Sequence, residues 1–404
     1  MSDRSARGRG RRGSRMIRAF AFVAATAGGL LLAQPSAAQT AANSEPVEIR
    51  AAVGLPPTHP VVATGWRTFE ETALRQTGNG LRFRIFVNGA VIGASGGLEP
   101  LAQGDADIGM VVPARYPDQF PFTGYLTELA LCEENGLAAA AAMTEHLLLH
   151  CPPCAAEFLD QNLVFLGTYS AAPYLLMSKQ PIDSRATMEG RKVRTPGSMW
   201  DRWTAALGAH PLQTAEGGDG SRADAVIDVA LALGIPATED GLRFVTDLPF
   251  GGYRGASPFT VNRDFWTRLT PAQRGALFSA AAAGLVAATE AYADQAVSAL
   301  AAASTDSGIG LVAADAELDG LVRGFAEQEG ERAAVTARDR EGIVDAADML
   351  AVYRELYEKY ANLLGAAQSP EQSADILMRE IYANLDPGIY ATAPAKDGGK
   401  VKQP

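Results

Sequence analysis

The apolar residues of the N-terminal half follow two spacings in turn. Several short runs are apolar at every second position, which is typical of strands, and the segments between them have the 3.6-residue period of helices. The pattern predicts strands at 47–53, 81–87 and 104–112 and helices at 61–77 and 98–103. This β-α-β-α-β order predicts an open, doubly wound sheet, which binds ligands at the carboxyl ends of its strands.

A second set of short apolar runs follows and indicates another α/β lobe. Strands are expected at 164–169, 174–178, 192–194, 243–246 and 252–261, and helices at 137–150, 155–161 and 197–207. Residues 224–233 fit either a strand end or a short helix. The last expected strand is long enough for both lobes to share it.

From Thr270 onward the pattern is helical and rich in Ala. Thr270, Pro271 and Gln273 form a typical helix start, with an N-cap, a Pro in the first turn and a capping-box side chain. A long helix is predicted to about residue 303, followed by helices at 316–328, 343–364 and 370–385. Two α/β lobes braced by helices make a two-lobe clamp.

The predicted organisation has six parts. They are a signal peptide at 1–38, a linker at 39–47, lobe 1 mainly at 48–170, lobe 2 with hinge strands mainly at 171–260, the long helix with bracing helices at 261–392 and a disordered tail at 393–404. With 404 residues, 47% of them apolar, the chain is long enough for two lobes with real cores. No internal run is expected to span a bilayer.

The N-terminus has the order of segments found in secretory signal peptides. Seven Arg residues lie within 1–18, an apolar stretch fills 19–33, and small residues at 36–38 offer a cleavage site. We therefore expect export to the periplasm. Removal of 1–38 changes the formal net charge from −11 to −17. So acidic a protein repels the phosphate backbone of nucleic acids, which makes nucleic acid a poor partner.

Arg194 is the first candidate for chemistry. It ends the short β-type run 192–194 at the boundary between the two predicted lobes, next to apolar Val193. Its planar guanidinium offers two parallel donors and keeps its charge at any physiological pH. We expect Arg194 to bind a carboxylate.

Aromatic and His residues near strand ends are further candidates. His59 lies in a Pro-bounded turn at a strand end, where it either contacts the ligand or stabilises the turn. Tyr116, Tyr169 and Tyr253 are expected to line a cleft, with a binding role as one possibility for each. Trp200 is expected to pack in a core.

The sequence Cys151-Pro-Pro-Cys154 allows a different chemistry. His146 and His150 lie four residues apart on the preceding helix, so they share a face. With the two Cys residues they offer the N and S ligands that zinc accepts. Cys-x-x-Cys is also a redox motif. The oxidising environment of an exported protein favours a local disulfide, with redox-active thiols or a metal site as alternatives. Cys132 is left over and is expected to be a buried small apolar residue.

Several of these stretches together resemble the substrate-binding proteins of TRAP transporters, the DctP-type family of periplasmic dicarboxylate and organic-acid receptors. The stretches that carry the resemblance are 54–60 (GLPPTHP), 101–109 (LAQGDADIG), 188–196 (MEGRKVRTP), 257–266 (SPFTVNRDFW) with 269–274 (LTPAQR), and the C-terminal helices. The resemblance implies a two-lobe fold of the periplasmic-binding-protein type, with hinge strands and a long helix across both lobes. It also implies a receptor that closes on a small organic acid and delivers it to a membrane permease. The Arg that ends the Gly-x-Lys-x-Arg run, here Arg194, is then the residue that binds the ligand carboxylate.

Two departures from the family pattern bear on the ligand. Many sialic-acid and dicarboxylate receptors of the family have a second Arg twenty residues earlier, where this chain has Tyr174. Many members have Asn at the position that Asp228 occupies here. A site with Arg194, Tyr174 and Asp228 suits a monocarboxylate with a hydroxyl or ammonium group better than a plain dicarboxylate. Asp228 on an outward-facing helix is the alternative.

The sequence gives no sign of an enzyme. It contains no nucleophile elbow, zincin signature or Walker motif, and we expect neither catalytic residues nor a cofactor. The expected partners are a small carboxylate ligand and the permease subunits of a TRAP transporter, and the protein is expected to be a monomer. The alternative function is that of an exported thiol or metal protein that uses the cluster of His146, His150, Cys151 and Cys154.

Overall fold

The structure is a computed structural model. It describes residues 45–93, 97–213, 223–233, 241–306 and 308–392. The chain divides into the units Met1–Ser44 and Glu45–Pro404, and every described residue belongs to the second unit. The expected signal peptide, most of the linker and the tail therefore lie outside the described residues.

The first sheet has five strands in the order β2-β1-β3-β10-β4. The strands are β1 (Val47–Ala52), β2 (Leu81–Phe86), β3 (Ile108–Val111), β4 (Leu163–Val164) and β10 (Ser257–Asn262). β1 pairs in parallel with β2 and β3, whereas β10 runs antiparallel to β3 and β4. The parallel 2-1-3 order confirms the doubly wound sheet that the sequence predicts.

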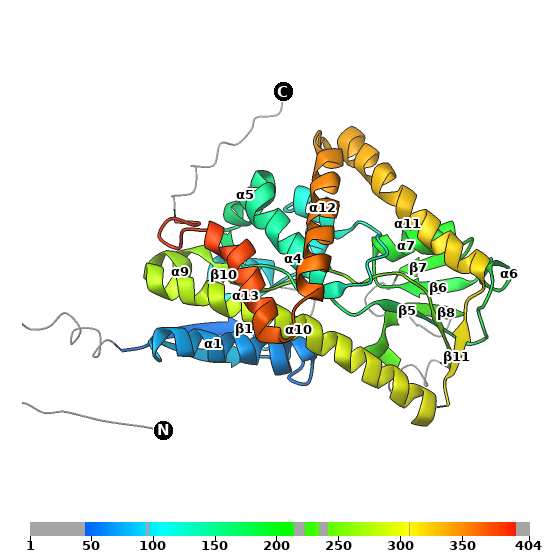
Figure 1. Cartoon of the computed structure of the whole chain (residues 1–404), viewed down its shortest axis with the longest axis horizontal. Coiled ribbons are helices and arrows are strands. Elements are labelled where there is room, and N and C mark those ends of the chain that lie inside the picture. The colour runs from blue at the N-terminus through cyan, green and yellow to red at the C-terminus, as the bar shows by residue number, and fades with distance from the viewer. Residues whose placement is uncertain (1–44, 94–96, 214–222, 234–240, 307, 393–404) are drawn as a thin grey trace, which may run out of the picture. The chain divides into compact units, whose positions relative to one another are not determined.

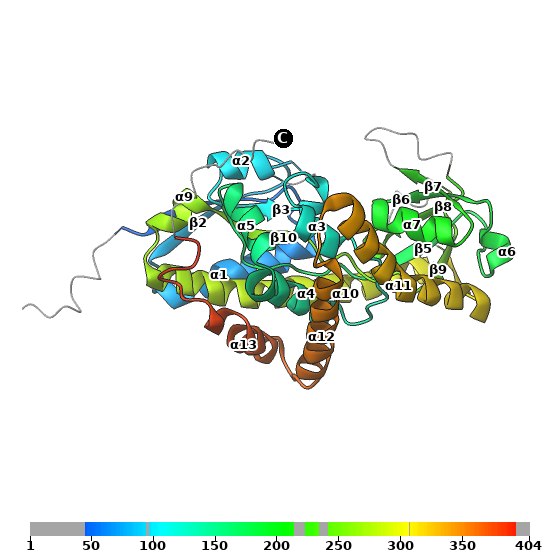
Figure 2. The ribbon, with the colours of Figure 1, turned by 90° about the horizontal axis from the view of Figure 1, so that it is seen from above.

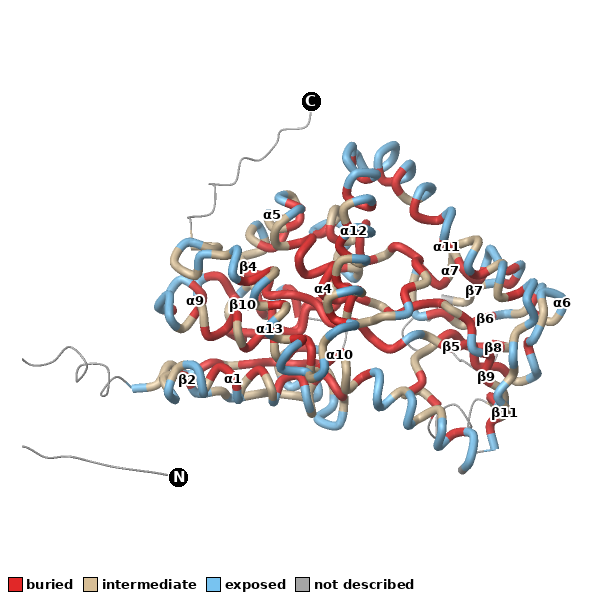
Figure 3. The backbone as a smooth tube through the Cα atoms, in the orientation of Figure 1, coloured by how far each residue is buried: buried red, intermediate tan, exposed pale blue. Residues whose placement is uncertain are grey.

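The second sheet has six strands in the order β11-β9-β5-β8-β6-β7. They are β5 (Tyr174–Ser178), β6 (Lys192–Thr195), β7 (His210–Gln213), β8 (Ala225–Val229), β9 (Phe244–Asp247) and β11 (Gly310–Ala313). Inner strands such as β10 of the first sheet and β5 of the second are largely buried, whereas the edge strands β2 and β11 are mostly half-buried or exposed (Figure 3). The mixed α/β architecture with two sheets confirms the predicted fold class.

Helices pack against both sheets, and most of the chain after residue 262 is helical. In lobe 1 they are η2 (Val61–Trp66), α1 (Arg67–Thr77), α2 (Leu98–Gln103), η3 (Pro113–Arg115), α3 (Pro121–Thr127), α4 (Gly136–Glu145), η4 (His146–His150) and α5 (Pro152–Asp160). In lobe 2 they are α6 (Arg185–Met188), α7 (Ser198–Ala206) and η6 (Ala230–Leu233). The others are α9 (Arg263–Arg268), α10 (Pro271–Asp306), α11 (Ala316–Thr336), η7 (Ala337–Glu341), α12 (Ala346–Gly365), α13 (Pro370–Glu380) and η8 (Tyr382–Asn384).

The long helix α10 contacts both parts of the molecule. It packs on α1 and η2 beside the first sheet and on η6 beside the second (Figures 1 and 2). Its start has the predicted capping box, because Gln273 Oε1 accepts from the Thr270 amide at 2.9 Å and Thr270 Oγ1 accepts from the Gln273 amide at 3.2 Å. The prediction that no internal run could span a bilayer is wrong, because Pro271–Thr305 is long and apolar enough to cross a membrane. With 67% of that apolar window buried, α10 is a core helix in this structure.

Two irregular segments connect the sheets where a long shared strand was predicted. Only Ser257 onward is a strand, and the residues before it pair loosely with 169–174. The Ala171 amide donates to the Tyr253 carbonyl at 2.8 Å, and the Tyr174 amide donates to the Gly251 carbonyl at 3.0 Å. Gly251 has φ +67, and a Cβ there would lie 2.4 Å from the Leu131 carbonyl oxygen. These close backbone approaches explain why the residues before Ser257 do not form the regular strand that the apolar pattern predicts.

Other element boundaries also differ from the prediction. The stretch 224–233 is a strand, β8, followed by a short helix, η6, so both predicted alternatives occur in sequence. The expected strand at 164–169 is reduced to β4 and one isolated bridge between Tyr169 and Ala256. Strands β7 and β11 were not predicted, because both are edge strands of four residues with little apolar alternation.

Candidate functional site

Arg194 and Asp228 lie together at one edge of the second sheet. β6 and β8 are parallel, with Arg194 opposite Val226, so Asp228 two residues further on points to the same face as Arg194. Burial raises the pKa of the Asp228 carboxyl, while the Val229 amide, which donates to it at 2.7 Å, and the Arg194 charge lower it. The two residues lie close enough to interact electrostatically at the carboxyl ends of both strands. The alternative that Asp228 lies on an outward-facing helix is wrong, because Asp228 is a partly buried residue of β8.

Tyr174 begins β5 at the same edge, because β5 runs antiparallel to β8. Its ring centroid lies 4.2 Å from that of Trp200 on α7, and Trp200 lies 6.3 Å from Tyr253. Burial raises the pKa of the Tyr174 hydroxyl, and the nearby Tyr292 and Asp228 raise it further. The edge of the sheet that carries Arg194 and Asp228 therefore also carries a wall of aromatic rings.

Tyr292 on α10 connects this wall to lobe 1. Its ring centroid lies 6.2 Å from Tyr169 in a stacked arrangement and 5.3 Å from His59 edge-on. Burial raises the pKa of Tyr292, and Tyr169 and Asp228 add to that effect. Burial also lowers the pKa of His59 to about 4, so its imidazole is neutral at neutral pH. The His59 Nδ1 accepts from the Val61 amide at 3.3 Å, which is the turn-stabilising role.

The structure thus connects five of the six predicted site residues through neighbouring rings and charges. We call the connected set the site cluster. It contains Arg194, Asp228, Tyr174, Tyr253 and His59, together with Tyr169, Trp200 and Tyr292. The sixth predicted residue, Tyr116, has a positional role, because its hydroxyl accepts from the Leu98 amide at 3.4 Å at the start of α2.

Two members of the site cluster were missed from the sequence. Tyr292 stands in an Ala-rich helix far along the chain, and its one signal is that it is a large ring among small residues. Trp200 is only 4% exposed, as expected for a core residue. Its Nε1, however, has no hydrogen-bond partner among the residues that the structure describes, and its ring faces Tyr174. This buried donor beside Tyr174 is therefore a candidate to donate a hydrogen bond to a polar group or a water molecule.

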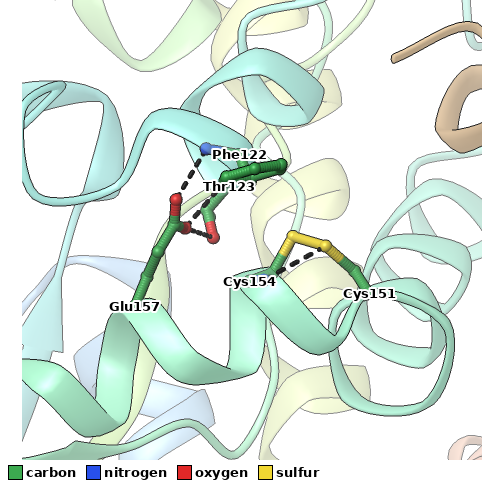
Figure 4. The surroundings of a disulfide bond; sticks show 5 residues. All are labelled: Phe122, Thr123, Cys151, Cys154 and Glu157. Atoms are coloured by element: carbon green, nitrogen blue, oxygen red, sulfur yellow. Dashed lines mark hydrogen bonds between the residues drawn. A yellow bond between two sulfur atoms is a disulfide. The ribbon is translucent and has the colours of Figure 1, made fainter. Parts of the chain in front are cut away.

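The two Cys residues of the predicted cluster cross-link the chain and stabilise the fold. Cys151 and Cys154 form a disulfide at the start of α5, and both are buried (Figure 4). One helical turn on, Glu157 accepts from the Phe122 and Thr123 amides at 2.6 and 3.0 Å, which ties α5 to the first turn of α3. This part of lobe 1 is thereby cross-linked both covalently and by hydrogen bonds.

The neighbouring His residues do not complete a metal site. His146 is fully buried with neither ring nitrogen hydrogen-bonded within the described chain, whereas His150 Nε2 lies 3.2 Å from Glu145 Oε1. Among the described residues, no three His, Cys, Asp or Glu side chains are placed to hold a metal ion. Cys132 is half-buried instead of fully buried as expected, and burial raises the pKa of its thiol to about 12.

A cavity of 790 Å³ lies beside the site cluster and not in it. Its lining comes from η3 and α3 of lobe 1, from α7 of lobe 2, and from α11 and η7. None of the six predicted site residues lines it. Glu128 and Ser198 in its wall are close in space to the site cluster, because Glu128 raises the pKa of Tyr253 and Ser198 precedes Trp200 on α7.

A known protein family matches part of this chain in sequence. Residues 52–217, which include Tyr174 and Arg194, match the family model of bacterial extracellular solute-binding proteins, family 7 (DctP). No curated protein matches the chain in sequence.

Solved structures match over most of both chains. A TRAP solute-binding protein from a marine metagenome, solved with co-purified pyroglutamate, has 18% identity and a TM-score of 0.61 over 77% of this chain and 100% of its own. A second one from a marine metagenome, specific for aromatic acid ligands and bound to 3-hydroxybenzoate, has 18% identity and a TM-score of 0.66 over 78% and 99%. A third, from Bordetella bronchiseptica with bound (R)- and (S)-mandelate, has 23% identity and a TM-score of 0.60 over 78% and 99%.

The likeness to these solved structures shows the fold of the chain. The two sheets and the long helix between them form the two-lobe fold of TRAP periplasmic solute-binding proteins. Within the chain, residues 52–217 are similar to the DctP family of bacterial extracellular solute-binding proteins.

Proposed function

We propose that this chain is the extracytoplasmic receptor of a TRAP-type secondary transporter. It is exported by its N-terminal signal peptide, binds a small organic acid in the periplasm and delivers it to the membrane permease. It acts as a monomer, binds one ligand molecule per chain and catalyses no reaction. The observation that carries the proposal is Arg194 near the carboxyl end of β6, where it interacts with Asp228, which in turn lies close to Tyr174.

Arg194 is the residue we assign to the ligand carboxylate. It is half-buried at the carboxyl end of β6, where a parallel sheet binds its ligands. A guanidinium gives a carboxylate two parallel charge-assisted hydrogen bonds, and partial burial strengthens them. In the family model the match extends across this strand.

Asp228 selects against a second carboxylate on the ligand. Two like charges 4 Å apart repel each other by about 4 kcal/mol at an effective dielectric constant of 20. A hydroxyl, amide or ammonium group on the ligand instead finds an acceptor in the Asp228 oxygens. The ligand class that we favour is therefore a monocarboxylate with a hydrogen-bond donor, in place of the dicarboxylates after which the family is named.

The aromatic members of the site cluster favour a ligand with a flat or cyclic body. Tyr174, Trp200 and Tyr253 approach one another from lobe 2 and the hinge, and Tyr169 and Tyr292 stack on the lobe 1 side. Rings of this kind bind flat apolar surfaces by stacking and edge contacts. Pyroglutamate, mandelate and 3-hydroxybenzoate, the ligands of the three similar structures, each combine one carboxylate with a ring and a donor.

Calorimetry with a panel of acids tests both levels of the proposal. The panel contains pyroglutamate, (R)-mandelate, 3-hydroxybenzoate and succinate, and each is also used at 100 times its Kd in a thermal unfolding assay. At that concentration a bound ligand stabilises the folded state by about 2.7 kcal/mol. We expect one or more of the three ring acids to bind with a stoichiometry of one, and succinate to bind at least tenfold more weakly. Tight binding of succinate without any response to the ring acids would contradict the ligand class, and no binding of any small carboxylate would contradict the receptor function.

A further inference from the structure

Helix α7 connects the ligand site to the rest of the molecule. It follows the Arg194 strand after two residues, Pro196 and Gly197, and carries Trp200 of the site cluster. Trp203 of the same helix anchors it in the lobe 2 core, where Nε1 donates to the Val322 carbonyl of α11 at 3.3 Å. Any movement of α7 relative to lobe 1 therefore moves the aromatic wall and the carboxylate-binding Arg together.

Arg202 of α7 joins three elements with one guanidinium. Its Nη2 donates to the backbone carbonyl of Glu128 at 2.5 Å, and Glu128 ends α3 in lobe 1. Its Nε pairs with the Glu329 carboxylate on α11, and its Nη1 donates to Ser198 Oγ at 3.3 Å. Ser198 also hydrogen-bonds with the Glu128 carboxylate, which adds a second contact between α7 and lobe 1. We call Glu128, Ser198, Arg202 and Glu329 the α7 junction.

The two sides of the α7 junction differ in strength. Glu329 is 5% exposed and lies just past Ala326, which belongs to the core of the second sheet. Glu329 therefore fixes the guanidinium on the lobe 2 side with a charged, mostly buried partner. The contact to lobe 1 is a neutral carbonyl together with a Ser hydroxyl facing Glu128, which are weaker partners.

Solvent reaches the α7 junction, which makes its lobe 1 contact reversible. The Arg202 side chain is 37% exposed, and all four residues of the junction line the 790 Å³ cavity. If α7 moves away from Glu128, water replaces the lost hydrogen bonds on both sides at little cost. Burial raises the pKa of the Glu128 carboxyl and the Arg202 charge lowers it, so the two groups interact electrostatically as well.

We propose that the α7 junction is a latch between the lobes, in which Arg202 is a positioning residue that slows ligand release without touching the ligand. Glu329 holds the guanidinium in place, and the Glu128 carbonyl is its target in lobe 1. The inference rests on the proposed receptor function for the release step, whereas the contact between the lobes is independent of any ligand. Each part therefore has its own measurement.

The interlobe distance tests the latch without ligand. Spin labels at Glu71→Cys on α1 and Ala186→Cys on α6, both exposed positions, in a Cys132→Ser background report the distance between the lobes. We expect Arg202→Gln to broaden this distance distribution toward longer distances. Arg332→Gln is the matched control, because Arg332 lines the same cavity but, among the residues that the structure describes, its side chain hydrogen-bonds to Gln328 within α11 and not to lobe 1. Equal distributions for wild type and Arg202→Gln would overturn the latch.

The rate of ligand dissociation tests the second part of the proposal, that the latch slows ligand release. The probe is pyroglutamate, (R)-mandelate or 3-hydroxybenzoate, whichever the wild-type chain binds, and stopped-flow fluorescence follows its release. We expect Arg202→Gln to raise the dissociation rate about tenfold, the factor that one hydrogen bond to a charged group commonly contributes, with an association rate within about twofold of wild type.

Conservative variants separate the latch from a general loss of structure. Arg202→Lys keeps the charge toward Glu329 but lacks the fork that reaches Glu128 at the same time, so we expect an intermediate rate. Ser198→Ala removes only the second lobe 1 contact and should give a smaller change in the same direction. An unchanged release rate in Arg202→Gln would overturn the latch, whereas failure of the wild type to bind any probe would overturn the receptor function and leave the distance measurement to judge the latch.

Discussion

Arg194 and Arg254 lie in opposite surroundings. Arg254 is fully buried in the hinge region, where Nη2 donates to the Leu129 carbonyl at 2.8 Å and Nε lies 3.2 Å from the Glu133 carboxylate. Tyr353 from α12 completes the group, with its ring 5.3 Å from the guanidinium and its hydroxyl donating to Glu133 at 2.6 Å. This charge is neutralised inside the protein.

Arg194 is instead half-buried near the end of a strand. Its electrostatic neighbour Asp228 lies on the same sheet, and the rings of the site cluster come from β5, α7, the hinge and α10. The difference teaches that burial of a charge does not by itself mark a function. A charge enclosed by its own protein partners stabilises the fold, whereas we propose that Arg194, near the carboxyl end of β6 beside Asp228, binds a ligand.

The largest effect expected from this comparison is on stability at Arg254. Arg254→Met leaves the Glu133 carboxylate buried without its cation, which should lower the free energy of unfolding by about 3–5 kcal/mol. The double variant Arg254→Met/Glu133→Leu should recover most of that loss. Urea unfolding followed by circular dichroism measures both, with the exposed Arg323→Met as the control that should change by less than about 1 kcal/mol. If Arg254→Met lowers the free energy of unfolding by less than about 1 kcal/mol, Arg254 does not have the stabilising role that distinguishes it from Arg194.

A second effect on stability should come from His146 and depends on pH. Burial, with a smaller contribution from His150, lowers the pKa of His146 to about 4, so the unfolded chain takes up a proton near pH 6.5 before the folded one does. Stability is then present above pH 6.5 and is lost as the pH falls toward 4, by about 3 kcal/mol in all. His146→Leu should remove that part of the pH dependence, and His210→Leu at an exposed position should not. The same slope in all three proteins would show that His146 does not carry it.

The disulfide should contribute less, and its loss should leave the site unchanged. Because only two residues separate Cys151 from Cys154, closing this loop stabilises the fold by about 2 kcal/mol in the chain-entropy view. Cys151→Ala/Cys154→Ala should lower the unfolding free energy by that amount and leave ligand affinity within about twofold. A loss of ligand binding in this variant would favour the alternative that the Cys residues serve the function.

The smallest predicted effect sharpens the assignment of Asp228. Asp228→Asn removes the repulsion that a second carboxylate meets and weakens the acceptor for a ligand donor. We expect the Kd ratio of succinate to 3-hydroxybenzoate to fall about tenfold, equivalent to about 1.4 kcal/mol. Calorimetry with both acids gives the ratio. An unchanged ratio would remove Asp228 from the ligand site.

The sequence predicted the fold well where local pattern and topology agree. Alternation at 47–53 and 81–87 fixed β1 and β2, and the capping box at Thr270 fixed the start of α10. The hinge was mistaken for a long strand because hydrophobicity does not show that Gly251 must close on the Leu131 carbonyl. Such contacts join segments more than a hundred residues apart in the sequence. The apolar pattern within one segment therefore does not reveal them.

Part of the site cluster was named from the sequence. Arg194 stands out because a cation beside apolar Val193 at a lobe boundary is unusual, and Tyr174 and Asp228 followed from departures in a known pattern. Tyr292 was missed because its partners Tyr169 and His59 meet it only when α10 packs across the first sheet. Tyr116 was included because it follows a strand, although its hydroxyl contacts the start of α2.

The measurement that tests the central claim most directly compares Arg194→Ala with Lys192→Ala by calorimetry. Lys192 lies two residues earlier on the same strand and is exposed, so its removal takes away an equal charge from the same face of β6. Using the ring acid that the wild type binds most tightly, the account predicts no measurable binding to Arg194→Ala, a loss above about 100-fold, and wild-type affinity in Lys192→Ala. Equal affinity of the two variants, with Arg194→Ala folded, would contradict the assignment of Arg194 as the residue that binds the carboxylate.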